Sequence, residues 1–256
     1  NFIHTPEHIN KVNHKIIENG ILDLSNETLR DKFFVGVLNS HGSEIYSFSY
    51  GTANGEYYGA RRNENGIIEI MRNNSDTGGN SWYYSVNEDM TAGEIVVRAG
   101  KFDPRVRAWY QAAESAKGPS FSPLYRHFVM DDLAVSAAWP IYDNSGMLQG
   151  VMGTHMLLSS IGTYLENTVQ DCNGYAFIIE KNTSSLVLDG TFKRYNIADI
   201  DNSDIKNAYK HYNTTHDLNF LHKGDEKLYV NMREINANGI DWIVISAVPQ
   251  GLLMTD

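Results

Sequence analysis

The residues with the clearest potential for ligand chemistry occupy one run, Phe102-Asp103-Pro104-Arg105-Val106-Arg107-Ala108-Trp109-Tyr110. Pro104 fixes its own φ and disfavours the helical conformation at the residue before it, so the run predicts a turn that leads into a short helix. A guanidinium offers a planar fork of donors that fits a carboxylate, and a neighbouring aromatic wall lowers the local dielectric constant. We therefore expect Arg107, Trp109 and Tyr110 to face one cavity. An arginine stacked on tryptophan at the surface is the alternative.

The histidines favour no metal site. His4 and His8 are four residues apart, but Thr5-Pro6 predicts a helix that begins after His4, so the pair does not share a helical face. Three further histidines lie in an asparagine-rich stretch without cysteine or clustered carboxylates: His211, His216 and His222. We expect exposed histidines and neither a metal ion nor a cofactor, with weak metal binding in that stretch as the alternative.

Composition and motifs also argue against an enzyme and against a nucleic-acid surface. The chain has no G-x-S-x-G elbow, no H-E-x-x-H pair, no P-loop and no G-x-G-x-x-G turn, and its adjacent Asp131 and Asp132 are typical of a solvated loop. A net charge of −10 leaves no basic stripe for phosphates. The single cysteine, Cys172, excludes an intramolecular disulfide and does not decide the compartment.

Membrane segments are not visible in the sequence. No stretch approaches the ~20 apolar residues of a membrane span, and no charged-then-apolar signal segment opens the chain. The chain begins at Asn1 and ends at Asp256 shortly after an apolar strand, as an ectodomain excised from a membrane receptor would. A complete soluble protein is the other interpretation.

The run at residues 102–110 resembles the DPRxRPWY signature of double Cache sensor domains. These are the extracytoplasmic ligand-binding parts of bacterial histidine kinases, diguanylate cyclases and chemoreceptors. Three later stretches resemble the family's W-S-x-P-Y, A-x-P-V-Y-D and G-V-x-G motifs in order and approximate spacing: Phe121-Ser122-Pro123-Leu124-Tyr125, Ala137-Ala138-Trp139-Pro140-Ile141-Tyr142-Asp143 and Gly150-Val151-Met152-Gly153. The resemblance covers essentially the whole chain.

Hydrophobic spacing predicts the elements before the signature run. Apolar residues from Ile9 to Ile17 recur at helical spacing and predict an amphipathic helix that ends near Gly20. Its apolar stripe packs either on its own domain or, as the resemblance implies, along a second copy as the end of a dimerising stalk. A short helix capped by Ser25 is expected at residues 25–30, followed by a hairpin of strands at residues 33–38 and 44–50.

The two halves of the chain repeat one order of elements. Strand pairs are expected at residues 134–142 with 147–154, at 175–180 with 185–188, and at 228–235 with 240–248. Each half opens with a strand–turn–strand and closes with a longer hairpin, which is the order of a PAS-like sheet. The predicted fold class is α+β, with two tandem PAS-like (Cache) modules, each an antiparallel sheet of about five strands, and a long N-terminal helix.

The same pattern predicts the domain limits. We expect an N-terminal helical stalk at residues 1–30, a membrane-distal ligand-binding module at residues 31–170, and a membrane-proximal module at residues 171–250. Residues 251–256 would form a stub toward a transmembrane segment. The boundary between the modules is placed near residues 170–174.

The resemblance also implies a set of pocket residues. In the amino-acid-binding branch of the family, the arginine and tryptophan of R-x-W-Y hold the ligand's carboxylate, and they map to Arg107 and Trp109. Tyr110 would line the same wall. Tyr125 maps to the last residue of W-S-x-P-Y, and Phe102 stands where that branch usually has tyrosine. The branch places two acids around the ligand's ammonium group, and here those positions hold His127 and His155.

These two departures determine the expected ligand. An ammonium group needs carboxylate partners, because a desolvated charge left unpaired costs several kcal/mol. Two imidazoles beside an arginine suit an anion, since each donates a hydrogen bond and adds positive charge if it is protonated. The hypothesis is a small organic anion, a mono- or dicarboxylate. Two alternatives stay open: Asp131 or Asp132 replaces the missing acids, or His155 faces a strand neighbour.

The predicted function is that of a small-molecule sensor domain on the periplasmic side of a bacterial inner membrane, in a receptor anchored by its full-length chain. Ligand closure in the distal module would be transmitted by differential affinity between open and closed states. An amino-acid or amine sensor of the same fold and a soluble periplasmic solute-binding protein are the alternatives. We expect no catalysis by this segment, no nucleic-acid partner, and a possible homodimer through the N-terminal helix.

Overall fold

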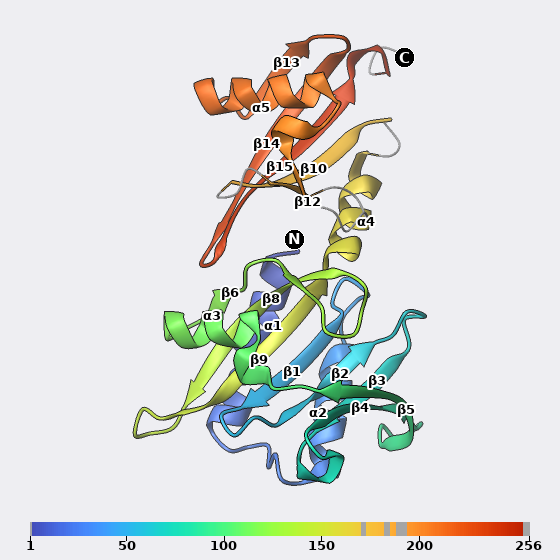
Figure 1. Ribbon diagram of the computed structural model, residues 1–256, viewed down its shortest axis with the longest axis vertical. Helices are drawn as coiled ribbons and strands as arrows, with labels where there is room; N and C mark the ends of the chain where they lie inside the picture. The colour runs from blue at the N-terminus through green and yellow to red at the C-terminus, as the bar shows by residue number, and fades with distance from the viewer. Residues whose placement is uncertain (1, 170–172, 182–184, 188–193, 253–256) are drawn as a thin grey trace. The chain divides into compact units, whose positions relative to one another are not determined.

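The computed structural model describes residues 2–169, 173–181, 185–187 and 194–252 (Figure 1). The chain divides into two compact units, residues 1–157 and residues 158–256. The boundary predicted near residues 170–174 falls partly on residues 170–172, and the predicted C-terminal stub partly on residues 253–256, all of which lie outside the described residues. The predicted domain limits remain predictions. No helix in the described ranges is both long and apolar enough to cross a bilayer.

The first unit is built on one antiparallel sheet. Its strands are β1 (Ser47–Thr52), β2 (Tyr57–Arg62), β3 (Ile68–Asn73), β4 (Asn80–Val86), β5 (Ala92–Lys101), β6 (Ser120–Phe121), β7 (Tyr125–Arg126), β8 (Leu133–Tyr142) and β9 (Leu148–Leu157). They are arranged in the order β5-β4-β3-β2-β1-β9-β8-β6, with β7 paired to β8. The hairpin predicted at residues 134–142 and 147–154 is confirmed as β8 and β9.

Helices cover both faces of this sheet. Helices α1 (His4–Glu18) and α2 (Glu27–Asn39) lie on one face (Figure 1). On that face, Phe34 of α2 contacts Phe48 of β1. The opposite face carries the 3₁₀ turn η2 (Pro104–Val106) and helix α3 (Ala108–Ala116). Because side chains alternate across a strand, each strand contributes to both layers.

Helix α1 packs on its own unit through polar contacts as well as through the buried Ile9. The buried Asn10 donates from Nδ2 to the carbonyl of Ala137 at 2.9 Å and accepts from the hydroxyl of Thr154 at 2.7 Å. One turn later, the ring of His14 stacks on Trp139 with centroids 4.1 Å apart. The face of α1 with Asn10 and His14 therefore packs on its own unit, whereas Val12 of the predicted apolar stripe is 50% exposed. Pairing of α1 with a second copy remains a prediction.

The hairpin predicted at residues 33–38 and 44–50 is wrong in its first strand. Residues 27–39 form the single helix α2, which is capped by Asn26 accepting from the amide of Leu29, and not by Ser25. Its buried residues recur at helical spacing and include two charged side chains: Arg30, Asp31, Phe34, Val35 and Leu38. An apolar run as short as residues 33–38 does not distinguish a strand from a buried helix face, and the packing against β1 to β3 favours the helix.

The second unit repeats the architecture on a smaller scale. Its sheet has the order β12-β11-β10-β15-β14-β13. The strands are β10 (Tyr175–Glu180), β11 (Ser185–Val187), β12 (Arg194–Asn196), β13 (Asn219–Lys223), β14 (Lys227–Ala237) and β15 (Ile240–Pro249), and the helices are α4 (Leu158–Val169) and α5 (Ser203–Thr215). Two predicted strand pairs are confirmed as β10–β11 and β14–β15.

The α+β class with two antiparallel modules is therefore confirmed. The estimate of about five strands is close for the second unit, whose sheet has six described strands, and too low for the first, which has nine. The difference arises from the short strands β6 and β7 and from the β4–β5 hairpin, which extend the first sheet at its two ends. These additions bring the signature run over the middle of the sheet.

Candidate ligand-binding site

The turn before α3 directs the two arginines of the signature run, Arg105 and Arg107, to different sides. Asp103 accepts a hydrogen bond from the amide of Arg105 at 3.0 Å and pairs with its guanidinium at 2.9 Å, which holds Arg105 on the exposed side. The chain then enters α3, and Trp109 is buried against the sheet. A Cβ on Gly51 of β1 would lie 3.1 Å from the Trp109 ring, and one on Gly153 of β9 would lie 3.2 Å from it. The two glycines therefore leave room for the indole.

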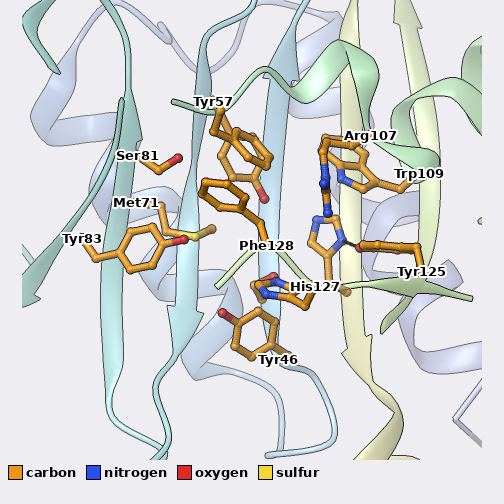
Figure 2. Close-up of a pocket in the computed structure, with 13 residues that line it drawn as sticks. Tyr46, Tyr57, Met71, Ser81, Tyr83, Arg107, Trp109, Tyr125, His127 and Phe128 are labelled. Carbon is orange, nitrogen blue, oxygen red and sulfur yellow. Dashed lines mark hydrogen bonds between the residues drawn. The ribbon is translucent and has the colours of Figure 1, made fainter. Parts of the chain in front are cut away.

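A small cavity lies between this turn, the sheet and the segment that follows β7 (Figure 2). Its free volume is about 20 Å³, which is enough for one water-sized group. Thirteen residues line it: Tyr46, Ser47, Tyr57, Met71, Ser81, Tyr83, Phe102, Arg107, Trp109, Tyr125, His127, Phe128 and His155.

Six of the seven residues singled out in the sequence line this cavity, and the seventh does not. Phe102, Arg107, Trp109, Tyr125, His127 and His155 come together there. Tyr110 is instead buried in the core behind Trp109, with ring centroids 5.9 Å apart, because consecutive helical residues point in different directions. The alternative in which an acid moves in has no support in this geometry, since Asp131 pairs with Arg126 on the surface and neither it nor Asp132 lines the cavity.

Arg107 is the one charged residue among the lining residues. Its guanidinium carbon lies 5.7 Å from the ring centre of Phe102 and 5.6 Å from that of Tyr125, and Nη2 donates to the carbonyl of Arg126 at 3.0 Å. Within the described part of the chain, no carboxylate lies within 4.0 Å of this group, whereas Arg61, Arg72 and Arg105 each pair with an acid. A guanidinium in that setting is able to bind an anionic ligand.

His155 is a neutral side chain fixed by two serines. Its Nε2 lies 2.7 Å from the hydroxyl of Ser49, and its Nδ1 lies 2.6 Å from that of Ser136, the residue directly opposite it on β8. Burial, followed by the positive fields of His127 and Arg107, lowers the pKa of His155 to about 3. Both ring nitrogens are therefore used within the sheet. The alternative in which His155 faces strand neighbours describes its contacts.

His127 is also neutral, but it keeps one donor. Its Nδ1 accepts from the amides of Val129 at 3.1 Å and Met130 at 3.0 Å, so the proton of the neutral ring is on Nε2. Burial, with smaller contributions from Arg107 and Arg61, lowers the pKa of His127 to about 3. At neutral pH neither ring carries a charge, so the histidines contribute a hydrogen-bond donor and not the positive charge that protonated imidazoles would add.

A buried ion pair borders the cavity at Tyr46. Arg61 and Glu69 lie directly opposite each other on β2 and β3, and their side chains meet at 2.9 Å. Nη1 of Arg61 also donates to the hydroxyl of Tyr46 at 3.2 Å, and its guanidinium stacks on the ring of Tyr83. Burial raises the pKa of Tyr46 to about 12, so its hydroxyl keeps its proton at neutral pH. Figure 2 shows Tyr46 and Arg107 at opposite ends of the cavity.

Most of the aromatic wall could not be read from the sequence. Tyr57, Met71 and Tyr83 come from three adjacent strands, and the pairings Gly59–Met71 and Met71–Tyr83 align them on the face that carries His155. Alternation within each strand marks such residues as sharing one face, but only the register brings them together. Among the described residues, no group of three potential metal ligands is close enough to hold a metal ion.

Comparison with known proteins agrees with this geometry. Residues 61–163 match the family described as methyl-accepting chemotaxis protein-like, first PDC sensor domain. The methyl-accepting chemotaxis protein PscA of Pseudomonas syringae pv. tomato is 31% identical over 90 residues, which are 35% of this chain and 14% of PscA. The matched part thus spans about one-seventh of that relative.

Solved chemoreceptor domains share the fold of the whole chain. The ligand-binding domain of Pseudomonas fluorescens CtaA in complex with L-alanine has a TM-score of 0.55 at 17% identity, covering 96% of this chain and 88% of that one. The ligand-binding domain of Pseudomonas aeruginosa PAO1 PctB in complex with L-Arg has a TM-score of 0.56 at 15% identity, covering 98% of this chain and 87% of that one. The ligand-binding domain of Campylobacter jejuni Tlp3 in complex with L-valine has a TM-score of 0.57 at 17% identity, covering 99% of this chain and 88% of that one.

The family match lies over the unit that contains the cavity, and the shared fold extends over both units. Together with the signature run at residues 102–110, they show that residues 61–163 resemble the first PDC sensor domain of methyl-accepting chemotaxis-like proteins and that the chain has the fold of bacterial chemoreceptor ligand-binding domains.

Proposed function

We propose that this chain is the ligand-binding domain of a membrane-anchored bacterial signalling receptor, exposed on the periplasmic side of the inner membrane. Its first unit binds a small solute through a carboxylate group, and the second unit passes the resulting change onward. The segment binds its ligand without transforming it. Helix α1 is the surface through which the receptor would pair with a second copy.

The observation that carries this proposal is the setting of Arg107. Its guanidinium lines a partly enclosed aromatic cavity and donates to a backbone carbonyl, and no acid among the described residues neutralises it. A ligand carboxylate would supply the missing charge, and a bidentate arginine–carboxylate contact is among the strongest polar interactions in proteins.

Two ligand classes fit this carboxylate clamp, each with its own support. Amino acids are favoured by the solved relatives, which were captured with L-alanine, L-arginine and L-valine. Carboxylates without an amine are favoured by the lining of this cavity, which contains no acidic side chain to balance an ammonium group. The solved relatives therefore favour an amino acid, and the charge of the cavity lining favours a carboxylate without an amine.

Binding requires the cavity to open and close. A free volume of about 20 Å³ is too small for a solute of several heavy atoms, so residues 127–132 must move outward to admit one. Return of this segment over the ligand would favour one state of the domain. Only the difference in affinity between the two states is able to drive a signal.

The test compares two arginines of the same turn. Arg107→Ala is expected to weaken binding of any responsive ligand by about 100-fold, because it removes a charge-assisted contact. Arg105→Ala is the matched control, since Arg105 is exposed and paired with Asp103. Isothermal titration calorimetry against a panel of amino acids and amine-free carboxylates gives the affinities of the unmodified chain and both variants.

The outcomes separate the possibilities. Equal losses in both variants, or a ligand whose affinity does not depend on Arg107, would sink the proposal. Flanking apolar spans and an output region in the parent gene would agree with a receptor. Their absence would favour a soluble periplasmic solute-binding protein.

A further inference from the structure

Building on the proposed function, we infer that the ligand is a monoanion with its carboxylate at one end and a neutral hydrogen-bond acceptor, such as a carbonyl oxygen, at the other. Arg107 receives the carboxylate. Tyr46 and His127 receive the neutral acceptor at the far end of the cavity, toward the Arg61–Glu69 pair.

The charge of the ligand follows from the charges around the cavity. Arg107 contributes one positive charge, Arg61 and Glu69 cancel each other at 2.9 Å, and both lining histidines are neutral. The lining and this buried pair therefore carry a net charge of +1. A second carboxylate on the ligand would have no cation at the far end, and an ammonium group would add a second positive charge without an acid to balance it.

The polarity of the far end follows from which groups are already engaged. The oxygen of Tyr46 accepts from Arg61 at 3.2 Å, which leaves its hydroxyl hydrogen available to a ligand. His127 accepts two backbone amides through Nδ1, which leaves Nε2–H. The two rings lie edge to face with centroids 4.8 Å apart, so the two donors belong to neighbouring side chains.

The other nitrogen and hydroxyl groups near Arg107 are less available. Both nitrogens of His155 contact serine hydroxyls, and the Tyr125 hydroxyl lies 2.7 Å from that of Ser136. The remaining lining hydroxyls, such as those of Tyr83 and Ser81, are able to donate or accept. They would tolerate a carbonyl oxygen, but they supply no negative charge for an ammonium group.

The experiment uses carboxylates that differ in one polar substituent. Titration calorimetry on the whole chain compares pentanoate, 4-oxopentanoate, glutarate and 5-aminopentanoate, in which the substituent lies toward the end opposite the carboxylate, and includes 2-aminopentanoate as the α-amino acid. A four-carbon set of butanoate, 3-oxobutanoate, succinate and 4-aminobutanoate controls for length. We expect the oxo acid to bind best in at least one set, by about tenfold or more over its dicarboxylate and amino counterparts.

Variants locate the contact. Tyr46→Phe should weaken binding of the preferred oxo acid about tenfold while leaving the unsubstituted acid within about twofold, because only the hydroxyl is lost. Tyr110→Phe, a buried tyrosine outside the cavity lining, should change neither affinity. The ligand ranking in the unmodified chain stands as a test even if Tyr46→Phe is destabilised by the loss of its bond to Arg61.

The failures are distinguishable. If Arg107-dependent binding is strongest for an amino acid or a dicarboxylate, or if Tyr46→Phe weakens both acids equally, this inference is overturned while the proposed function stands. If no carboxylate of either set binds, or if Arg107→Ala leaves binding unchanged, both are overturned.

Discussion

The side chains around Arg107 show how burial sets charge in this molecule. A histidine in water titrates near pH 6.5, whereas burial and neighbouring positive groups lower the pKa of both His127 and His155 to about 3. The cavity thus has polar side chains without additional charge. Arg107 alone determines the sign of the charge that the cavity lining presents to a ligand.

This burial predicts that acid destabilises the fold through His155. In the unfolded chain His155 takes up a proton as the pH falls below 6.5, while in the folded chain it stays neutral until about pH 3. The contribution of His155 to the free energy of unfolding is therefore present above pH 6.5 and is lost progressively between pH 6.5 and 3. This one group accounts for a loss of about 2 kcal/mol between pH 7 and 5. Urea unfolding at a series of pH values measures it.

A variant isolates the effect of His155. His155→Gln keeps groups that bond to Ser49 and Ser136 but does not titrate, so its stability should fall less steeply between pH 7 and 5. His8→Gln changes an exposed histidine and should keep the slope of the unmodified chain. Parallel slopes for His155→Gln and the unmodified chain would contradict the assignment.

At this scale the sequence was a good guide to residue positions and a poor one to residue chemistry. The Asp-Pro turn and the helix after it favour one cavity for Arg107 and Trp109, and the resemblance to the double Cache signature adds to that expectation, but the same pattern also places Tyr110 there, which lies in the core. The state of His155 depends on Ser49 and Ser136, which are 106 and 19 residues away in the chain. The burial that keeps His155 neutral is created by residues of two other strands, and no local sequence pattern predicts it.

Among the elements, the segment after β7 has the features of a lid. It is tied within itself by the amide of His127 donating to the carbonyl of Asp132 at 2.9 Å and by the two amides on His127 Nδ1. It contacts the rest of the unit through His127 against Tyr46, through Met130, whose sulfur accepts from Arg61, and through Phe128, 37% exposed, against Phe102 at a centroid distance of 5.0 Å. Phe128 is the exposed member of these three and would act as the latch of the segment.

Phe128→Ala should therefore speed ligand release. An aromatic pair contributes about 0.5–1.5 kcal/mol, so we expect the dissociation rate to rise about threefold to tenfold with little change in folding stability. Stopped-flow tryptophan fluorescence, with Trp109 in the cavity wall, follows the release. Tyr229→Ala, which removes an exposed aromatic residue of the second unit, should leave the rate unchanged. An unchanged rate in Phe128→Ala would rule out the latch.

Helix α1 is held to the sheet by a side chain that is able to satisfy two partners at once. Asn10→Ala leaves the carbonyl of Ala137 and the hydroxyl of Thr154 without it in a buried site, so the free energy of unfolding should fall by about 2–3 kcal/mol. Chemical denaturation measures the loss, and Lys11→Ala on the exposed side of α1 serves as the control. A loss below about 0.5 kcal/mol would mean that α1 is held by apolar contacts alone.

Helix α2 illustrates where element prediction from the sequence stops. Its buried face includes Arg30 and Asp31, charged residues that normally mark a solvated side. They are buried because Arg30 stacks on Tyr58 at 3.7 Å and Asp31 binds Arg72 of β3. These partners are distant in the sequence, so Arg30 and Asp31 are not recognisable from the sequence as part of a buried helical face. The apolar run at residues 33–38 is therefore predicted to be a strand.

At the scale of the whole molecule, the two units have separate cores and all of the cavity residues belong to the first. Ligand binding should therefore slow amide hydrogen exchange mainly in the first unit, above all at residues 125–132 and in β9. Mass spectrometry of the intact chain, with and without ligand, measures this. Equal protection of α5 and β14 would contradict a ligand site confined to the first unit.

The chain passes from the cavity strand into a helix without an intervening loop. Strand β9 carries His155 and ends at Leu157, and α4 begins at the next residue, Leu158. Glycines inserted between these two residues would break the continuity of the backbone that leaves the first unit. If the proposed receptor transmits ligand binding along this segment, the insertion should leave the first unit able to bind its ligand while the response of the full-length receptor is lost.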